Sequence, residues 1–205
     1  MDGEPLVRAR ACQEWLTFVQ SEDDPWKSRF FAALDPTLRE TIESASRVAW
    51  LPVGVHVKLA DIVQEAYGAV RAHAYYRRSF RSALSGPVLG PFVRTAAQVL
   101  GITVHAFIRW AGRGWETAFR NAGGLSGEVV GPERARLTYF GLPPVCTASD
   151  GWMLSAQGSA YGVYDIIGVE GVVRLDLSKR SEGTMVLDLE WSSRGGEVKK
   201  DLPGR

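Results

Sequence analysis

Residues 172–191 read VVRLDLSKRSEGTMVLDLEW, and this segment decides the fold class. Hydrophobic and charged residues alternate on both sides of the Ser-Glu-Gly run at 181–183, a pattern typical of two half-buried strands joined by a turn. The hydrophobic positions are Val173, Leu175, Leu177, Met185, Leu187, Leu189 and Trp191. Because a shift of one residue would turn this whole set to the other face, we expect Leu175, Leu187 and Leu189 to face the helices.

A second pair of strands is predicted upstream of this hairpin. Residues 134–139 alternate in the same way, and the Pro-Glu pair at 132–133 predicts a turn from an earlier strand around 128–130. The expected inward positions are Ala135, Leu137 and Tyr139. Residues 158–168, between the two strand pairs, are expected to form a short helix. The resulting order, β-β-α-β-β, indicates an antiparallel sheet.

The first 120 residues show helical spacing instead. Hydrophobic residues recur with this spacing in segments 6–19, 38–45, 59–70, 92–100 and 104–119. The Trp-Leu-Pro run at 50–52 predicts a break, because proline disfavours the helical conformation of the residue before it. Helices followed by strands predict an α+β fold, with an N-terminal helical layer packed on a C-terminal antiparallel sheet.

Length and composition favour one domain. The chain has 205 residues, of which 45% are hydrophobic, enough to form a core without disulfides or metals. We expect a single α+β domain over residues 1–191, with a helical part at about 5–121 and a sheet part at about 125–191. Residues 192–205 lose all periodicity and are expected to form a flexible tail.

Charge and cysteine usage restrict the location and the partners. The net charge of +1 argues against a dedicated nucleic-acid binder. The acidic N-terminus has no apolar stretch of a secretory signal, and Thr95–Ile108, the longest uncharged stretch, is too short to span a membrane. Cys12 and Cys146 lie far apart, so we expect two reduced, buried thiols in a cytoplasmic protein.

The sequence contains none of the motifs that would identify a reaction. There is no Walker A sequence, no G-x-S-x-G and no H-E-x-x-H, and the three histidines are scattered, so we predict no metal site and no cofactor. His105 lies in an apolar helix, where it is either a haem ligand or a partly buried side chain bound to a backbone carbonyl. We favour the second. A triad of distant Ser, His and Asp side chains stays open as an alternative.

Two groups of residues are candidates for ligand or partner binding. Tyr75, Tyr76 and Arg77 belong to a basic and aromatic cluster with Arg71, Arg78 and Arg81. This cluster either binds an anionic ligand, an acidic partner or a nucleic-acid backbone, or is a solvated helix end balanced by acids. The second group is Phe92, Arg109, Trp110 and Arg113. It lies in two apolar helices and predicts a homodimer or an obligate protein partner, unless these helices form the monomer's own central hairpin.

Three structural landmarks carry a resemblance to known families. They are Trp50-Leu51-Pro52 followed by Val57 and Leu59, the segment from Trp115 to Gly123, and Leu187-Asp188-Leu189-Glu190-Trp191. With these landmarks the chain resembles a group of myxobacterial paralogous proteins of unknown function. That group is similar in plan to TRAPP-like, 4-vinyl-reductase-type and haem-NO-binding-type ligand-binding domains. The resemblance implies a pocket or channel between helices and sheet, and dimerisation through helices.

The departures from these families concern their cofactors. Haem-binding members carry a Tyr-x-Ser-x-Arg signature, whereas residues 76–81 of this chain read YRRSFR, with different spacing. Cys146 stands alone where some vinyl-reductase-type domains hold a metal. Haem and metal therefore do not carry over with the resemblance.

Aromatic residues without an activated nucleophile or an acid–base pair favour binding over catalysis. We therefore expect a non-catalytic sensory or adaptor domain that binds a small apolar ligand, a protein partner or both. The alternatives are an enzyme with a dispersed, motif-less active site and a structural scaffold subunit.

Overall fold

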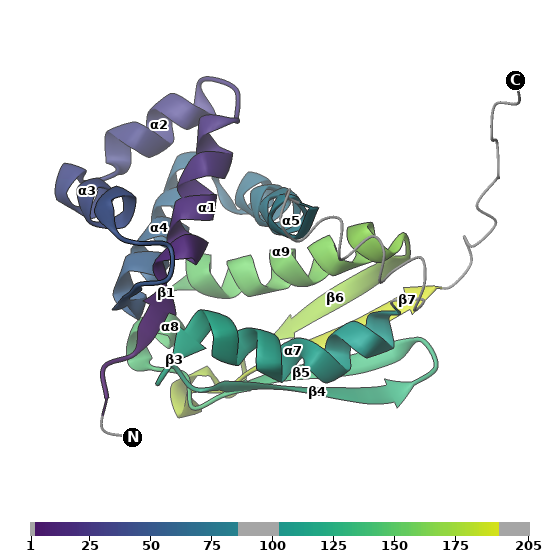
Figure 1. Cartoon of the computed structure of the whole chain (residues 1–205). Coiled ribbons are helices and arrows are strands. Elements are labelled where there is room, and N and C mark those ends of the chain that lie inside the picture. The colour runs from purple at the N-terminus through teal and green to yellow at the C-terminus, as the bar shows by residue number, and fades with distance from the viewer. Residues whose placement is uncertain (1–2, 86–102, 193–205) are drawn as a thin grey trace, which may run out of the picture.

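The computed structural model describes residues 3–85 and 103–192 and has the predicted α+β architecture (Figure 1). The helices are α1 (Ala9–Gln20), α2 (Trp26–Ala33), α3 (Pro36–Ser44), α4 (Val53–Tyr67), α5 (Ala69–Ser85), α7 (Val104–Ala118), α8 (Pro144–Ala148) and α9 (Asp150–Ile167). The strands are β1 (Leu6–Arg8), β2 (Trp50–Pro52), β3 (Phe119–Arg120), β4 (Gly124–Gly131), β5 (Arg134–Phe140), β6 (Glu170–Asp176) and β7 (Met185–Ser192). None of the described helices has the length and apolar character needed to cross a membrane.

The C-terminal sheet confirms the predicted antiparallel strands and the predicted inward side of their leucines. Its strands lie in the order β4-β5-β7-β6, and all neighbours are antiparallel. Leu175 pairs with Leu187, and Val173 pairs with Leu189. Leu187 and Leu189 are buried and Leu175 is half-buried, so these side chains face the interior as expected.

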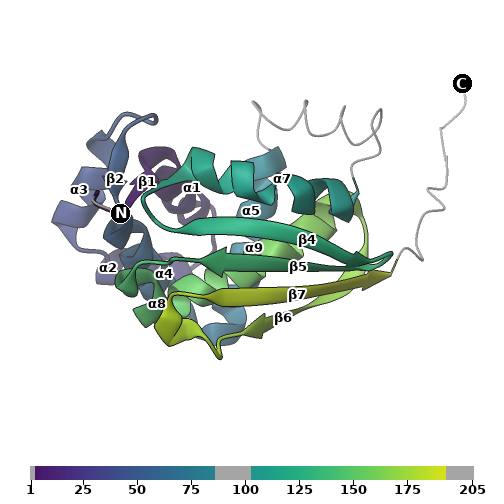
Figure 2. The same cartoon turned by 90° about the horizontal axis from the view of Figure 1, so that it is seen from below.

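Two helices cover the inner face of this sheet, while Figure 2 shows the strands in front of the helices when the molecule is seen from below. α7 lies on β4 so closely that a Cβ on Gly127 would stand 2.1 Å from the carbonyl oxygen of Ile108. Side chains of α9 bind the edge strand β6: Gln157 donates to the carbonyl of Val173 at 2.9 Å, and the amide of Val173 donates to Tyr161 at 3.0 Å. These bonds use backbone groups that an edge strand would otherwise expose.

α9 also contacts the helical layer, because it lies between α5 and the sheet (Figure 1). Glycines allow this approach. A Cβ on Gly158 would lie 2.7 Å from the Cβ of Tyr76, and one on Gly162 would lie 2.9 Å from the carbonyl oxygen of Arg77. The central helix therefore packs directly against the backbone of its neighbour.

The prediction of an entirely helical first part was wrong at three short strands. Residues 6–8 and 50–52 pair with each other, and β1 also pairs with β3, which gives a sheet of order β2-β1-β3. Leu6 thus lies in a strand instead of the first helix, and the predicted break at Trp50-Leu51-Pro52 is the strand β2. Such short strands are fixed by long-range pairing and leave no periodicity in the sequence.

Two helix boundaries also differ from the prediction. Gly68, with φ of 73°, ends α4, so Val70 belongs to the next helix and is 89% exposed. α9 begins at Asp150 instead of 158, because Ser149 caps it by accepting a hydrogen bond from the amide of Trp152 at 2.9 Å. Ser192, predicted as the first residue of the tail at 192–205, is instead the last residue of β7. The predictions for Phe92, for the helix at 92–100 and for the rest of the tail lie outside the described residues.

Candidate functional site

The structure separates the predicted site residues into unconnected places. Tyr75, Tyr76 and Arg77 lie on α5, whereas His105, Arg109, Trp110 and Arg113 lie on α7. Phe92 lies outside the described part of the chain. The fold therefore does not bring the two groups together into a single site.

Tyr75 and Tyr76 belong to the core. Their side chains are 0% and 1% exposed, and their hydroxyls donate to the carbonyls of Trp15 at 3.0 Å and Ala60 at 2.8 Å. Burial raises the pKa of both phenols well above the usual value, so both stay neutral. They tie α5 to α1 and α4 and are closed to a ligand from solvent.

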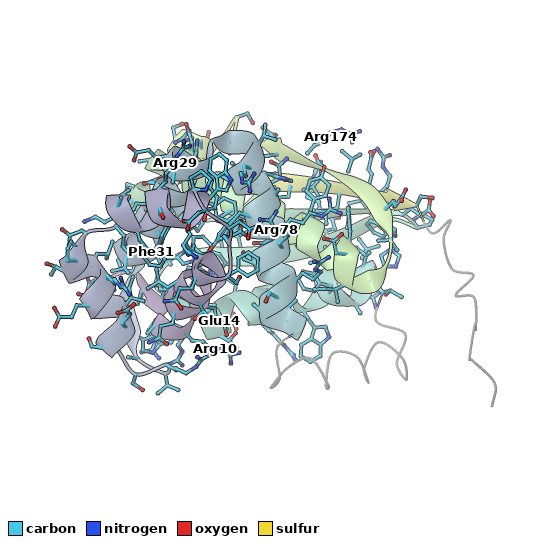
Figure 3. The ribbon with its side chains drawn as sticks, turned by 90° about the horizontal axis from the view of Figure 1, so that it is seen from above. Arg10, Glu14, Arg29, Phe31, Arg78 and Arg174 are labelled. Atoms are coloured by element: carbon cyan, nitrogen blue, oxygen red, sulfur yellow. The ribbon has the colours of Figure 1, made fainter. Side chains whose placement is uncertain are left out.

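The arginines beside them are balanced by acids. Arg77 binds Asp165 of α9 with two hydrogen bonds, at 2.8 and 2.5 Å, and this contact lowers the pKa of Asp165. Arg78 (labelled in Figure 3) binds both oxygens of Glu22, at 2.7 and 2.9 Å. Arg77 and Arg78 are therefore balanced by acids, as one of the two alternatives for this cluster predicts. Their N–H groups that bind these acids are not open to an anion from solvent.

An aromatic cluster fills the interior between α1, α4 and α7. The ring of His56 lies 4.3 Å from that of Trp15 and 5.7 Å from that of Phe119, and Phe119 stacks on Trp115 at 4.1 Å. Burial lowers the pKa of His56 to about 4, and its Nδ1 has no hydrogen-bond partner among the described residues. His56 was not a predicted site residue, and its place in the cluster makes it a neutral core side chain.

His105 lies in the first turn of α7 and faces the sheet. Its Nε2 is 3.3 Å from the carbonyl oxygen of Gly131, and its ring lies 5.1 Å from that of Trp191. This is the contact with a backbone carbonyl that the second alternative for His105 describes.

The outward face of α7 is the remaining place where predicted site residues meet. Arg109, Trp110 and Arg113 are all exposed, with Trp110 at 62%, and the guanidinium of Arg113 lies 4.8 Å from the ring centre of Trp110. The opposite side of the helix is buried: Val104, Ile108, Ala111 and Trp115. The buried and the exposed residues of α7 therefore lie on opposite sides of the helix, as its hydrophobic spacing requires.

The small sheet extends this face with residues that were not predicted as a group. The ring of Trp50 lies between the guanidinium groups of Arg8, at 3.8 Å, and Arg120, at 4.5 Å. Arg8 also donates to the carbonyl of Thr117, at 3.4 Å, which joins β1 to the last turn of α7. We call Arg8, Trp50, Arg109, Trp110, Arg113 and Arg120 the arginine–tryptophan face. The pairing of β1, β2 and β3 brings Arg8, Trp50 and Arg120 to the C-terminal end of α7, the helix that carries the other three residues. These short strands show no periodicity in the sequence, so the sequence did not predict this face.

Two open hollows among the described residues lie on either side of α8. The larger, of about 570 Å³, lies between α4 and the start of α9, and the smaller, of about 430 Å³, lies between α8 and the turn before β7. In the larger one, the hydroxyl of Ser149 donates to the carboxylate of Asp61. The hydrogen-bond partners of Ser149 in the described part are thus a carboxylate and an amide, not the histidine of a triad. Neither hollow lies between α7 and the sheet.

Comparison with known proteins shows the fold but no sequence family. No family model and no curated protein matches the chain. Among solved structures it is similar to an oxygen-binding H-NOX domain related to soluble guanylate cyclases, with a TM-score of 0.59 and 12% identity over 90% of this chain and 94% of that one. A mutant H-NOX protein from K. algicida gives a TM-score of 0.57 and 10% identity over 91% and 97%. The haem-NO-binding part of the resemblance is thus supported at the level of the fold, and the myxobacterial and TRAPP-like parts are not.

The histidines do not fit the haem that this fold implies. A haem iron needs an axial side chain with its ligating atom open to the iron. Each of the three histidines packs its ring against an aromatic ring: His56 against Trp15, His73 against Tyr161 at 5.1 Å, and His105 against Trp191. None of the three lines either of the two hollows beside α8. Burial raises the pKa of both cysteine thiols to about 12, which disfavours a thiolate ligand. Among the described residues, no cluster of three His, Cys, Asp or Glu side chains could hold a metal ion.

Proposed function

We propose that this chain is a non-catalytic sensory domain on the H-NOX fold that works without haem. The fold carries the proposal: it is shared over nine-tenths of both chains with an H-NOX domain that binds oxygen and with H-NOX proteins described in the Fe(II) state. The solution structure of an IWP-051-bound H-NOX from Shewanella woodyi gives a TM-score of 0.51. These similar structures support a domain that binds a ligand and signals the bound state to another protein.

The chemistry of the described residues supports binding over catalysis. The cysteines are buried with raised pKa values, and His56 is sealed inside an aromatic cluster. The carboxylates with a lowered pKa owe the shift to hydrogen-bond partners, such as Arg77 for Asp165. A catalytic acid or base needs a pKa near the working pH and access to a substrate, and these groups offer neither.

A protein partner is our second candidate, and the arginine–tryptophan face favours it. Trp110 is 62% exposed beside two exposed arginines, and aromatic and arginine side chains are the types enriched at interfaces. The proposal includes a homodimer through α7 as one form of this contact. It also includes a small apolar ligand, a cytoplasmic location and a single domain over residues 1–191.

Native mass spectrometry of the protein as purified, with an absorbance spectrum of the same sample, tests the proposal. We expect the 22.5 kDa chain, alone or with a non-haem adduct, and no Soret band. A stoichiometric haem adduct would show that one of the histidines is open to iron and would refute the haem-free part. Turnover of a substrate that binds to the protein would refute the non-catalytic part.

A further inference from the structure

The arginine–tryptophan face is a cationic surface that the fold leaves without matching acids. Within the described chain, Arg109, Arg113 and Arg120 form no ion pair within 4.0 Å. The arginines that do form ion pairs are Arg10, Arg39, Arg47, Arg77, Arg78, Arg134, Arg136, Arg174 and Arg180. Glu116 is the acid that the described part of α7 presents beside these arginines. This surface therefore differs in charge balance from most of the others that carry arginines.

The two tryptophans stack against three arginines of this face. Arg113 lies over Trp110 at 4.8 Å, and Arg8 and Arg120 lie on Trp50 at 3.8 and 4.5 Å. A guanidinium stacked on an indole keeps the N–H groups at its edge, where they can bind a carboxylate in two places. Because stacking already restricts these long side chains, less conformational entropy is lost when an anion binds.

A second copy of the chain, the other form of this contact, fits this face less well than an acidic partner does. In a two-fold symmetric contact the same patch lies on both subunits, so Arg109 and Arg113 would face like charges. A nucleic acid is also disfavoured, since the net charge of the chain is only +1. An acidic polypeptide fits better: carboxylates match the guanidinium edges, and an apolar side chain matches the exposed indole of Trp110.

We propose that the arginine–tryptophan face docks an acidic segment of a partner protein that also carries an apolar residue. At 1.5 Å per residue, α7 rises about 14 Å from Arg109 to its end at Ala118, next to Arg120. An extended segment of about five residues spans that length. The inference rests on the proposed binding role, but a haem adduct would refute the haem-free sensor without changing the result below.

The test is fluorescence anisotropy with a labelled peptide that has a Glu-Glu-Tyr-Glu-Glu core. The test variant is Arg109→Glu with Arg113→Glu. The matched control is Arg29→Glu with Arg71→Glu, because these exposed arginines stack on Trp26 at 4.9 and 4.3 Å in the same manner (Figure 3 labels Arg29). Arg29 follows the acidic run Glu-Asp-Asp at 22–24 in the sequence. Circular dichroism verifies that each variant is folded.

We expect the test variant to bind the peptide at least about tenfold more weakly and the control to bind like the wild type, with affinity that falls as salt is added. Trp110→Ala is also expected to weaken binding, without a loss of fold, since this ring is exposed. Three results would overturn the proposal: no binding by the wild type, an equal loss in both double variants, or tighter binding of single-stranded DNA that the test variant abolishes. A wild-type dimer that the test variant dissociates would also overturn it.

Discussion

The buried His56 predicts a loss of stability in mild acid. Its ring is 7% exposed, lies against Trp15, and has a pKa of about 4 because burial disfavours the charged form. In the unfolded chain an ordinary histidine has a pKa of about 6.5. Between these two values the unfolded state binds a proton that the folded state does not bind, so the free energy of unfolding falls as the pH falls from about 7 toward 4.

The size of the loss follows from the two pKa values. With one pKa unit equal to about 1.36 kcal/mol, the full effect is about 3 kcal/mol below pH 4, and about 2 kcal/mol of it has developed at pH 5. Against a total stability of roughly 5–15 kcal/mol, this loss is large. His56→Phe keeps a flat ring beside Trp15 and removes the titrating group, so its stability should change less over the same interval.

Urea unfolding at pH 7.5 and pH 5.0, followed by tryptophan fluorescence, measures the difference. We expect the midpoint of the wild type to drop by about 1 M more than that of His56→Phe. His73→Asn serves as a control, because the pKa of His73 is also lowered but its side chain is only half-buried. If the urea midpoints of the wild type and His56→Phe fall equally between pH 7.5 and pH 5.0, His56 is hydrated or has a hydrogen-bond partner. Our description of His56 as a neutral side chain sealed in the core would then be wrong.

Three further predictions test the packing. Gly127→Ala should destabilise the protein by about 1–3 kcal/mol, because its Cβ would meet the carbonyl oxygen of Ile108. Gly114→Ala, with open space around it in α7, should instead raise stability by up to about 1 kcal/mol. Thermal melting tests both, because the melting temperature should fall for the first variant and rise for the second. Asp35→Ala should cost about 1 kcal/mol, since the Asp35 carboxylate caps α3 at 2.9 Å, and an unchanged urea midpoint would contradict it. The thiol of Cys12, whose pKa burial raises to about 12, should resist a thiol reagent in the native state and react in denaturant.

The sheet could be predicted because period-2 alternation reports burial directly. At Met185, Leu187, Leu189 and Trp191 every second residue is buried, as the alternation with charged residues requires. The cap at Asp35 is likewise a local feature, because it depends on an acidic residue followed directly by proline at the start of α3. Each of these features depends on neighbours within a few residues.

The features that the sequence did not reveal depend on partners far along the chain. The strand β1 exists because its three residues pair with β2 and β3, more than forty and one hundred positions away. The hydroxyl bonds of Tyr75 and Tyr76 are likewise long-range, so a dense basic and aromatic run on α5 could not be recognised as core plus paired arginines. Composition alone does not distinguish a binding cluster from one that folding has already neutralised.

The exposure of Trp110 shows that the packing of the folded chain separates a binding surface from the core. Five of the seven tryptophans are buried or half-buried against other rings: Trp15, Trp26, Trp115, Trp152 and Trp191. Trp110 lies outside because α7 has one side available for β4, and Gly127 lets Ile108 occupy that side at backbone distance. With Ile108 and Trp115 turned inward, helical geometry turns Arg109, Trp110 and Arg113 outward. The same close approach that seals the interior therefore creates the surface that we propose for a partner.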